Sequence, residues 1–416
     1  MSDVKAVRGT HDLIGEDQRR HNHIIQTARH ITSLYGFEEW VTPVFEETRV
    51  FARSLGDTSD IVSKEMYSFE DRGGDSLTLR PEGTAGICRA LVTNSLTQSL
   101  PQKAFYAGPM FRYERPQKGR YRQFYQIGAE LLGVDVPFAD AEIIAMGYDI
   151  LKALGLADDV VLELNTLGDA KSRQAWREAL IAYFKAVKDK LSSDSQNRLE
   201  RNPLRILDSK SPEDRALLAD APSLENFMTE EARTFWDQLR KALDHFKIPF
   251  KTNPFIVRGL DYYNHTVFEF VTTKLGAQGT VLAGGRYDGL VAEMGGPAVP
   301  AIGWASGVER LSLLLEKVPE VSKPVVVIAL SAIAQPMAFE VLQNLRHHNI
   351  HSEIIYKGNP RKQMEKANKL GAPIAIIIGE EEVQQQQVQL KNLHLGDQKA
   401  VALEQIVSQI KMMTAK

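Results

Sequence analysis

The chain has 416 residues, of which 43% are hydrophobic and 25% are charged. This is an ordinary globular composition, which can bury a sizeable core and predicts two or three domains. The net charge of -3 excludes attraction of a polyanion by overall charge, so any such partner must meet a local basic patch.

The first predicted elements are a helix and a strand. Residues 16–35 carry apolar side chains at the spacing of one helix face, and Gly36 ends the helix. Residues 37–45 read as a strand that contains Pro43. Because proline has no N–H for a sheet ladder, this strand belongs at an edge or a bulge. The edge could pair with another subunit or remain unpaired, and the sequence favours neither alternative.

A short segment, LTLRPEGT at residues 77–84, predicts a strand that reaches Arg80 and turns at Pro81. The turn presents the side chains of Glu82 and Thr84. A loop carboxylate with a hydroxyl two residues further on can hold an ammonium group. An ion pair within the turn is the alternative.

Residues 105–132 predict two strands joined by a basic turn that contains glycine. Because side chains alternate along a strand, one face of the second arm carries Arg120, Arg122, Phe124, Gln126, Gly128 and Glu130. Arg112 and Glu114 share a face of the first arm. Cations at one end, an amide in the middle and a carboxylate at the other end suit a zwitterion attached to a phosphate. Gly128 is expected to leave room for that ligand. A hairpin whose polar face meets water is the alternative.

Residues 165–250 change to charged helical stretches, which predicts an inserted helical module at about residues 170–250. Strand-like segments resume at Phe255 and at residues 267–272 and 279–283. We therefore expect the module to interrupt one sheet rather than to end a domain.

Two glycine-containing segments follow the insertion. Residues 256–270 place Arg258 before Gly259 and near Asp261, with two tyrosines next. The planar fork of an arginine suits a phosphate or a carboxylate, and a surface pair with Asp261 is the alternative. Residues 282–291, LAGGRYDGLV, would let the backbone approach a flat ligand, but they do not match the GxGxxG pattern of a Rossmann fold.

Residues 301–318 predict a glycine-rich strand end that leads into an amphipathic helix. Arg310 falls in the first turn of this helix, where the dipole disfavours a cation by roughly 0.3 to 1 kcal/mol. A bound phosphate would compensate for this cost, and so would Glu309.

The last part of the chain, residues 321–416, predicts a small α/β domain with βαβαβ order and an alternating edge strand at residues 384–387. From Lys323 onward the chain has 11 Lys and Arg against 8 Asp and Glu, whereas the residues before it have 39 against 45. Residues 357–369 concentrate the cations. This basic segment either contacts phosphate or forms a solvated helix face.

Cysteine use and the N-terminus indicate the compartment. Cys88 is the only cysteine, which excludes internal disulfides and a cysteine-based zinc site. No signal peptide and no apolar run near the ~18 residues of a membrane span is evident, so we expect a cytoplasmic protein without membrane contact. His21 and His23 point to nearly opposite sides of a helix, so no metal site is predicted from side-chain clusters.

Taken together, these segments resemble the class II aminoacyl-tRNA synthetases. FRYE in the hairpin is similar to the second signature motif of that class, GVERL to the third, and the first helix with its prolyl strand to the first. LRPEGT, FRYERPQKGRYRQF, VRGLDYYNHTVFEF and LAGGRYDGL narrow the resemblance to the histidyl-tRNA synthetase family. The resemblance implies an α/β and α+β multidomain protein, with an antiparallel-sheet catalytic core at residues 1–320 and an anticodon-binding α/β domain at residues 321–416.

The implied activity is that of a histidine–tRNA ligase. Such an enzyme converts L-histidine and ATP, which carries Mg²⁺, to histidyl-adenylate and pyrophosphate. It then transfers the histidine to the 3′ end of tRNA(His) in protein synthesis. The family also implies a homodimer. A catalytically silent, synthetase-like regulator is the alternative, but such paralogues lack the C-terminal domain.

The resemblance also assigns the ATP site. Arg112 would bind the α-phosphate and Arg310 the γ-phosphate, and Glu114, Arg120 and Phe124 would complete the site. Arg258 would lie between the substrate carboxylate and the α-phosphate, which makes Arg258 and Arg112 the catalytic candidates.

The amino-acid pocket and the tRNA contact follow from the same resemblance. The residues that would bind histidine are Glu82, Thr84, Gln126, Glu130, Arg258, Tyr262, Tyr263, Tyr287 and Gly303. Among these, Glu130 and Tyr263 would bracket the imidazole. Arg115 and Gln117, in the turn of the hairpin, would meet the acceptor end of the tRNA.

Overall fold

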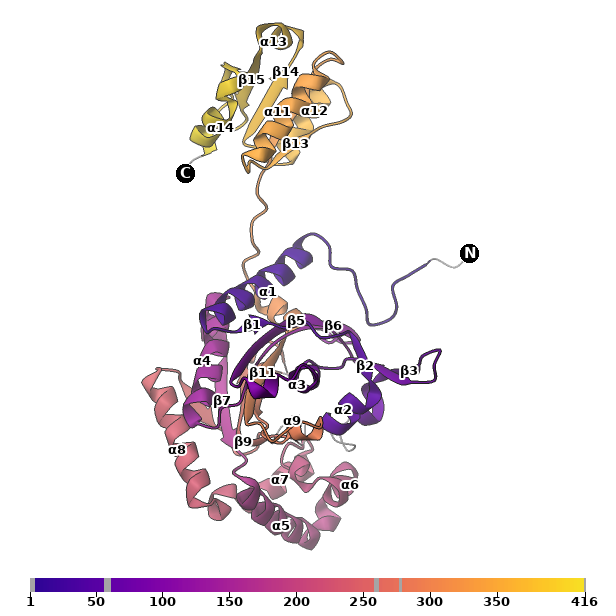
Figure 1. The fold of residues 1–416 in the computed structure, drawn as a ribbon, viewed down its shortest axis with the longest axis vertical. Helices are drawn as coiled ribbons and strands as arrows, with labels where there is room; N and C mark the ends of the chain where they lie inside the picture. Colours follow the sequence, from indigo (N-terminus) through magenta and orange to yellow (C-terminus); the bar gives the residue numbers. More distant parts are fainter. Residues whose placement is uncertain (1–3, 56–60, 258–261, 277–278, 415–416) are drawn as a thin grey trace. The chain divides into compact units, whose positions relative to one another are not determined.

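The computed structural model describes residues 4–55, 61–257, 262–276 and 279–414 (Figure 1). The chain divides into two compact units, Met1–Pro319 and Glu320–Lys416, which we call the N-terminal and the C-terminal unit. Within the described ranges, no helix has both the length and the apolar character that crossing a membrane requires.

An eight-stranded sheet lies at the centre of the N-terminal unit (Figure 1). In spatial order its strands are β1 (Glu38–Glu39), β5 (Gln102–Phe111), β6 (Gln123–Leu132), β11 (Ala301–Gly307), β10 (Thr280–Arg286), β9 (Asn264–Val271), β7 (Val161–Thr166) and β8 (Phe250–Thr252). Neighbouring strands run antiparallel, except that β1 with β5 and β7 with β8 are parallel. This confirms the predicted antiparallel-sheet core.

The two faces of the β5 and β6 hairpin differ in character. On one face, Phe105, Ile127 and Ala129 are buried in an apolar core. Helices that contribute to this core include α1 (Glu16–Leu34), α4 (Pro137–Ala153), α8 (Glu230–His245) and α10 (Val308–Leu314). The other face carries Gln126 and Glu130, and the helices packed near it are α3 (Thr84–Thr93) and α9 (Leu290–Glu293). The hairpin therefore turns a polar face toward the interior, not toward water.

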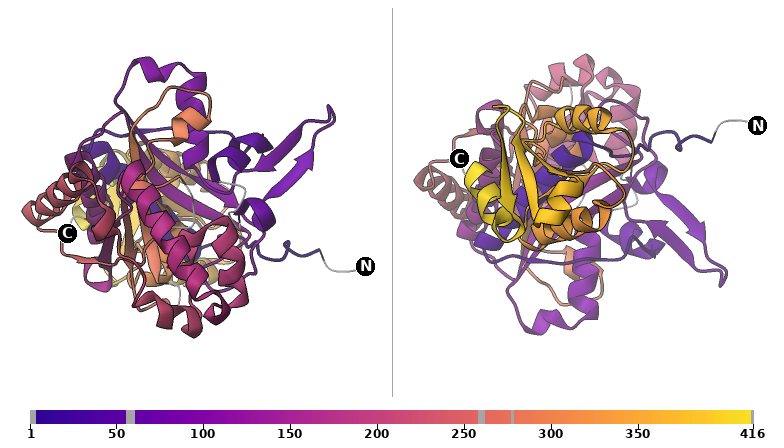
Figure 2. Two further views of the ribbon diagram at one scale, coloured as in Figure 1. Left: turned by 90° about the horizontal axis from the view of Figure 1, so that it is seen from below. Right: turned by 90° about the horizontal axis from the view of Figure 1, so that it is seen from above.

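The single strand predicted at residues 37–45 is wrong, because two short strands in different sheets replace it. β1 forms the edge of the large sheet, whereas β2 (Phe45–Glu47) belongs to a three-stranded sheet with β4 (Ser76–Leu79) and β3 (Tyr67–Glu70). Pro43 lies between them, where its missing N–H interrupts the ladder. The β3 and β4 hairpin projects from the unit (Figures 1 and 2).

The predicted helical insertion is confirmed. It contains α5 (Ala170–Ala186), η4 (Lys188–Lys190), α6 (Ser193–Arg201), η5 (Pro203–Ile206), α7 (Pro212–Leu218), η6 (Leu224–Phe227) and α8 (Glu230–His245). Asp169 caps α5 by accepting a hydrogen bond from the Ser172 N–H at 2.7 Å, and Thr229 caps α8 in the same way. β7 before the insertion and β8 and β9 after it lie in one sheet, as the sequence predicted.

Other short elements complete the N-terminal unit. They are α2 (Thr48–Leu55), the π-helix η1 (Ile61–Glu65), and the 3₁₀ turns η2 (Leu96–Gln98) and η3 (Ala157–Asp159).

The C-terminal unit is a five-stranded sheet in the order β13 (Ser352–Ile354), β12 (Val325–Ala329), β14 (Ile374–Ile378), β15 (Gln387–Asn392) and β16 (Gln398–Ala402). The first three strands are parallel, which confirms the predicted βαβαβ order, and the last two are antiparallel. Helices α11 (Gln335–His347) and α14 (Ile406–Thr414) pack on one apolar cluster of the sheet and α12 (Pro360–Lys369) on another.

The strand predicted at residues 384–387 begins later than expected. Residues 384 and 385 end α13 (Glu380–Gln385), and Gln386 adopts a left-handed conformation with φ of 53° before β15 starts. The predicted alternation therefore belongs to β15, which starts after a helical turn. The predicted edge position is wrong, because β15 pairs with β14 on one side and β16 on the other. A 3₁₀ turn, η7 (Leu403–Gln405), precedes α14.

Candidate active site

A buried carboxylate, Glu130, lies on the polar face of β6, and only 1% of it is exposed. The Thr84 hydroxyl donates a hydrogen bond to Oε1 at 2.7 Å, and the Tyr287 hydroxyl donates to Oε2 at 2.5 Å. The three side chains come from β6, from the start of α3 and from the residue after β10. Each carboxylate oxygen keeps a further lone pair, so Glu130 can also accept a hydrogen bond from a ligand.

The pKa of Glu130 is raised to about 8, mainly because burial disfavours the charged carboxylate. Hydrogen bonds from Tyr287 and Thr84 lower the pKa, and repulsion from the Glu82 carboxylate raises it. A ligand that brings an N–H donor or a positive charge into this pocket would stabilise the ionised form.

This raised pKa makes stability depend on pH. Between the ordinary glutamate value of 4.5 and about 8, the folded protein keeps a proton on Glu130 that the unfolded chain has released. Rising pH should therefore lower the free energy of unfolding more steeply in the wild type than in Glu130→Gln, by about 1.4 kcal/mol per pH unit. Denaturant titrations of both proteins across this window measure the difference. Parallel pH profiles would contradict the assignment.

Glu82 and Gln126 lie beside this carboxylate. The Glu82 carboxylate accepts hydrogen bonds from the backbone N–H groups of Thr84 at 2.6 Å and Ala85 at 2.9 Å, so it caps the first turn of α3. Gln126 Oε1 accepts from the N–H of Gly83 at 3.2 Å. Burial raises the pKa of Glu82. The structure thus brings together the turn and the hairpin residues that the sequence singled out separately.

Tyr106 is a pocket residue that sequence reasoning missed. It lies opposite Gly128 in the hairpin, and a Cβ atom on that glycine would lie 2.2 Å from its ring. Gly128 therefore makes room for Tyr106, and the expectation that it makes room for a ligand is wrong. The Tyr106 hydroxyl donates to Gln126 Oε1 at 3.4 Å. The signal that could have identified Tyr106 as a pocket residue was a tyrosine opposite a glycine on a polar strand face.

Gly303 lies in β11 directly opposite Glu130. A Cβ atom there would lie 1.7 Å from Glu130 Oε2, so no side chain fits beneath the carboxylate. Gly284 and Gly285 serve a similar purpose, because Cβ atoms there would lie 2.1 and 2.5 Å from the backbone oxygens of neighbouring strands. These two glycines allow close packing of strands, and not the approach of a flat ligand as the sequence suggested.

Tyr262 and Tyr263 precede β9 and close one side of the pocket. The ring of Tyr262 lies 4.6 Å from that of Tyr263 and 5.6 Å from that of Tyr287, measured between centroids. Arg173, on α5 of the insertion, donates a hydrogen bond from Nη1 to the Tyr263 carbonyl at 2.8 Å. Arg258 lies outside the described residues, so its predicted place between carboxylate and phosphate stays a prediction.

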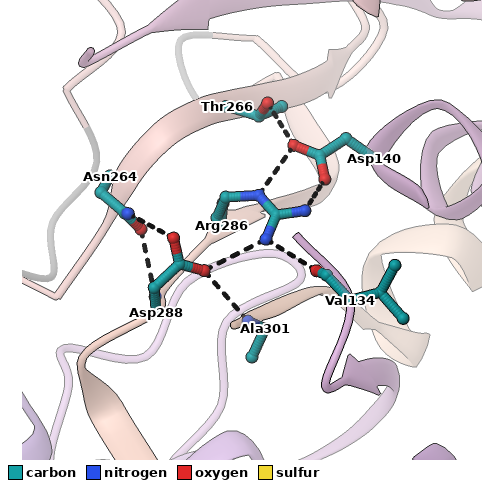
Figure 3. A network of polar contacts seen from close by, with 7 residues as sticks. All are labelled: Val134, Asp140, Asn264, Thr266, Arg286, Asp288 and Ala301. Atoms are coloured by element: carbon teal, nitrogen blue, oxygen red, sulfur yellow. Dashed lines mark hydrogen bonds and ion pairs between the residues drawn. The ribbon is translucent and has the colours of Figure 1, made fainter. Parts of the chain in front are cut away.

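A buried ion pair joins Asp140 to Arg286 (Figure 3), the residue that directly precedes Tyr287 of the pocket in the chain. Sequence reasoning missed this pair. Arg286 at the end of β10 donates from Nε to Asp140 Oδ2 at 3.2 Å and from Nη2 to Oδ1. Thr266 donates its hydroxyl to Asp140 Oδ2 at 2.5 Å. Although burial opposes its charge, the Asp140 carboxylate raises the pKa of Arg286. Burial also raises the pKa of Asp140, but a guanidinium, which stays protonated, donates to both carboxylate oxygens and so favours the ionised pair, which holds α4 against the sheet.

The same network continues to Asp288 (Figure 3), the residue that follows Tyr287 in the chain. Asp288 Oδ1 accepts from Arg286 Nη1 at 3.1 Å and from the Ala301 N–H at 3.0 Å, and Oδ2 accepts from Asn264 Nδ2 at 2.7 Å. Both chain neighbours of Tyr287 are thus fixed. This arrangement directs the Tyr287 hydroxyl at Glu130.

A cleft opens next to the pocket, on the side of the hairpin turn. All five residues that the sequence assigned to ATP line it, namely Arg112, Glu114, Arg120, Phe124 and Arg310. Gln126 also lines the cleft, and so belongs to both sites.

The cations of the cleft are held in different ways. Arg112 donates from Nε to the Pro81 carbonyl at 2.9 Å and lies 5.3 Å from the Phe124 ring centroid. Arg120 pairs with Glu114 at 3.0 Å. Burial lowers the pKa of Arg310, and repulsion from Arg120 lowers it further. Two guanidinium groups that repel each other across a cleft favour a bound polyanion.

Glu309, the alternative partner for Arg310, has another contact. Both of its carboxylate oxygens accept from the Tyr125 N–H, at 2.9 and 3.1 Å, which ties α10 to β6. Burial raises the pKa of Glu309 to about 7.

The turn of the hairpin carries the residues predicted to meet tRNA. Gln117 and Arg120 exchange backbone hydrogen bonds at 3.1 and 2.8 Å, and Gly119 between them has φ of 76°. Arg115 and Gln117 are exposed. The structure thus presents both side chains to solvent in the same turn as Gly119 and Arg120, which line the cleft.

Comparison with known proteins agrees with this geometry. The family model of histidyl-tRNA synthetase matches residues 9–311, and that of an anticodon binding domain matches residues 324–413. The match to the second domain weighs against a regulator that lacks it.

Curated relatives match over nearly the whole length. The histidine–tRNA ligase of Gluconacetobacter diazotrophicus is 67% identical over 98% of this chain and 98% of its own. That of Rhodospirillum rubrum is 50% identical over 97% of each.

Solved structures share the fold. The apo histidyl-tRNA synthetase of Staphylococcus aureus is 34% identical, with a TM-score of 0.83 over 98% of this chain and 100% of its own. From this family match over most of the N-terminal unit and these relatives that match over nearly the full length, we conclude that the chain belongs to the histidyl-tRNA synthetase family and is an ATP-dependent aminoacyl-tRNA ligase, as its motifs predicted.

Proposed function

We propose that the chain activates L-histidine with ATP in the described pocket and cleft and transfers it to the 3′ end of tRNA(His). The observation that carries this proposal is the position of a buried carboxylate, Glu130, beside a cleft lined by Arg112, Arg120 and Arg310. A small polar side chain fits the pocket around Glu130, and a triphosphate fits the cleft.

Histidine is the side chain that Glu130 suits best. One imidazole nitrogen would donate to the Glu130 carboxylate, and the Tyr263 hydroxyl would meet the other. The α-amino group would meet Glu82 and Thr84, and the substrate carboxylate would point along β6 past Gln126. An amino acid without both ring nitrogens would leave buried polar groups unpaired, which can reject it by roughly 10⁴-fold.

The cleft would hold ATP. Arg112, fixed by the Pro81 carbonyl and close to Phe124, would contact the α-phosphate. Arg310 would contact the γ-phosphate, and Glu114 and Arg120 would complete the site. Attack of a carboxylate on the α-phosphate brings like charges together, so fixed cations are the main means of lowering the barrier. The proposed role of Arg258 between the two substrates belongs to the same electrostatic scheme.

Mg²⁺ would enter as the complex with ATP. Among the residues that the structure describes, no group of three His, Cys, Asp or Glu side chains could hold a metal ion. Mg²⁺ commonly binds through phosphates with only one or two carboxylates. Glu114, which lines the cleft between two arginines, is the carboxylate that fits this arrangement.

The remaining partners are also proposals. Arg115 and Gln117 would meet the acceptor end of the tRNA, and the C-terminal unit would bind its anticodon. The exposed edge strand β1 would lie at a homodimer contact in the cytoplasm. Light scattering distinguishes a dimer from a monomer.

Pyrophosphate exchange with each of the twenty amino acids tests the proposed function. Only histidine should support exchange. Glu130→Gln should raise the KM for histidine by about 10- to 100-fold and leave the KM for ATP within about twofold, because it removes a charged acceptor from the amino-acid pocket alone. Exchange with another amino acid would refute the specificity, and equal losses for both substrates would refute the role of Glu130.

A further inference from the structure

One cation of the helical insertion, Lys210, reaches the cleft of the proposed ATP site. It lies between η5 and α7 and lines this cleft together with Arg112 and Arg310. It also lines an adjoining cavity, whose walls include Leu207 of the insertion and Glu269 of β9. Lys210 is exposed, and within the described ranges no residue forms a hydrogen bond or an ion pair with it. The insertion thus extends a cation to the junction of two cavities.

The loop that carries Lys210 is held in place by a buried carboxylate. Asp214, in the first turn of α7, accepts hydrogen bonds from the Ser192 N–H at 2.8 Å, the Ser195 hydroxyl at 2.6 Å and the Ser209 hydroxyl at 2.5 Å. Ser209 directly precedes Lys210. The backbone from which the lysine extends is therefore fixed, although its side chain is exposed.

Among the described residues, five carboxylates face the two cavities, and each already has a partner. Glu163 accepts from Asn253 Nδ2 at 2.7 Å, and Asp208 also has a partner. Glu114 pairs with Arg120 at 3.0 Å, and Glu269 accepts from the Thr280 hydroxyl at 2.6 Å. Both oxygens of Glu309 accept from a backbone N–H. These groups therefore do not neutralise Lys210. Together with the three arginines of the cleft, Lys210 favours a ligand with several negative charges.

We propose that Lys210 contacts the β- and γ-phosphates of ATP and stabilises pyrophosphate as it leaves. The inference rests on the proposed function of the cleft. In that step, a carboxylate oxygen of histidine forms a bond to the α-phosphorus. The bond from this phosphorus to the bridging oxygen of the β-phosphate breaks, and the electron pair departs with pyrophosphate. The leaving group gains negative charge, so a cation beside it binds more strongly in the transition state than in the ground state.

The test compares two steps of the reaction in Lys210→Met. Pyrophosphate exchange with histidine should show kcat/KM for ATP lowered about tenfold, because the lysine is solvent-exposed and partly screened. Single-turnover transfer from preformed histidyl-adenylate to tRNA should be unchanged, because pyrophosphate has already left. Lys210→Arg should retain most of the exchange activity. Lys241→Met replaces an exposed lysine of α8 outside both cavities and should behave like the wild type.

The outcomes separate this inference from the proposed function. Absence of histidine-dependent exchange in the wild type would refute the proposed function itself. Normal exchange in Lys210→Met, beside a wild type that activates histidine, would refute the role of Lys210 alone. Slowed transfer with normal exchange would place Lys210 at the acceptor end of the tRNA and overturn the inference. Equal melting temperatures of the variants and the wild type confirm that the fold is intact.

Discussion

Replacing Arg310 by alanine is expected to lower kcat/KM for ATP in pyrophosphate exchange by on the order of 10² to 10³. Arg310 lies in α10 at the wall of the cleft, where burial and the nearby Arg120 both lower its pKa. A bound triphosphate would remove this repulsion, so the loss of Arg310 should lower kcat/KM for ATP far more than that for histidine. Stopped-flow or exchange kinetics at varied ATP measure the effect.

A second assay separates the arginines of the cleft. Arg310→Ala should transfer histidine from preformed histidyl-adenylate to tRNA at the wild-type rate, because the γ-phosphate is absent from that step. Arg112→Ala should slow both steps, because the α-phosphate remains in the adenylate. The exposed Arg72, outside the cleft, provides the matched control as Arg72→Ala. If Arg310→Ala slows both steps equally, the assignment to the γ-phosphate is wrong.

Asp140→Ala is expected to lower the free energy of unfolding by about 3 to 5 kcal/mol. The substitution leaves the Arg286 guanidinium buried, at 1% exposure, without the buried Asp140 carboxylate and with only the partly exposed Asp288 as an acidic partner. It also removes the acceptor of the Thr266 hydroxyl. Denaturant unfolding measures the loss. Because Arg286 precedes Tyr287, surviving protein should also have a raised KM for histidine and an unchanged KM for ATP.

Two further variants show whether the cost comes from the buried charge. The double variant Asp140→Ala with Arg286→Met removes both charges and should recover part of the stability. Glu39→Ala breaks the surface pair that Glu39 forms with Arg29 at 2.6 Å, and it should cost at most about 1 kcal/mol. A double variant as unstable as Asp140→Ala would show that packing, and not an unpaired charge, accounts for the loss.

Much of the fold could be predicted because its signals are local. The spacing of apolar residues predicted α1, the change to charged helical stretches predicted the insertion, and the order of strands and helices predicted the parallel part of the C-terminal sheet. Predictions failed where neighbours in space decide the structure. The Arg80 guanidinium donates to the Thr42 carbonyl, and Pro43 lies between β1 and β2. Whether this segment forms one strand or two depends on which strands lie nearby.

By itself, the sequence determined the family, the hairpin and the polar face on which Gln126 and Glu130 alternate, because alternation along a strand needs no knowledge of distant residues. Only the tertiary structure decided that this face is buried. It joined Glu130 to Thr84 and Tyr287, filled the space over Gly128 with Tyr106, and brought the insertion to the cleft. These contacts join residues far apart in the chain. Packing and hydrogen bonding across the sheet select them, and no local pattern encodes such pairings.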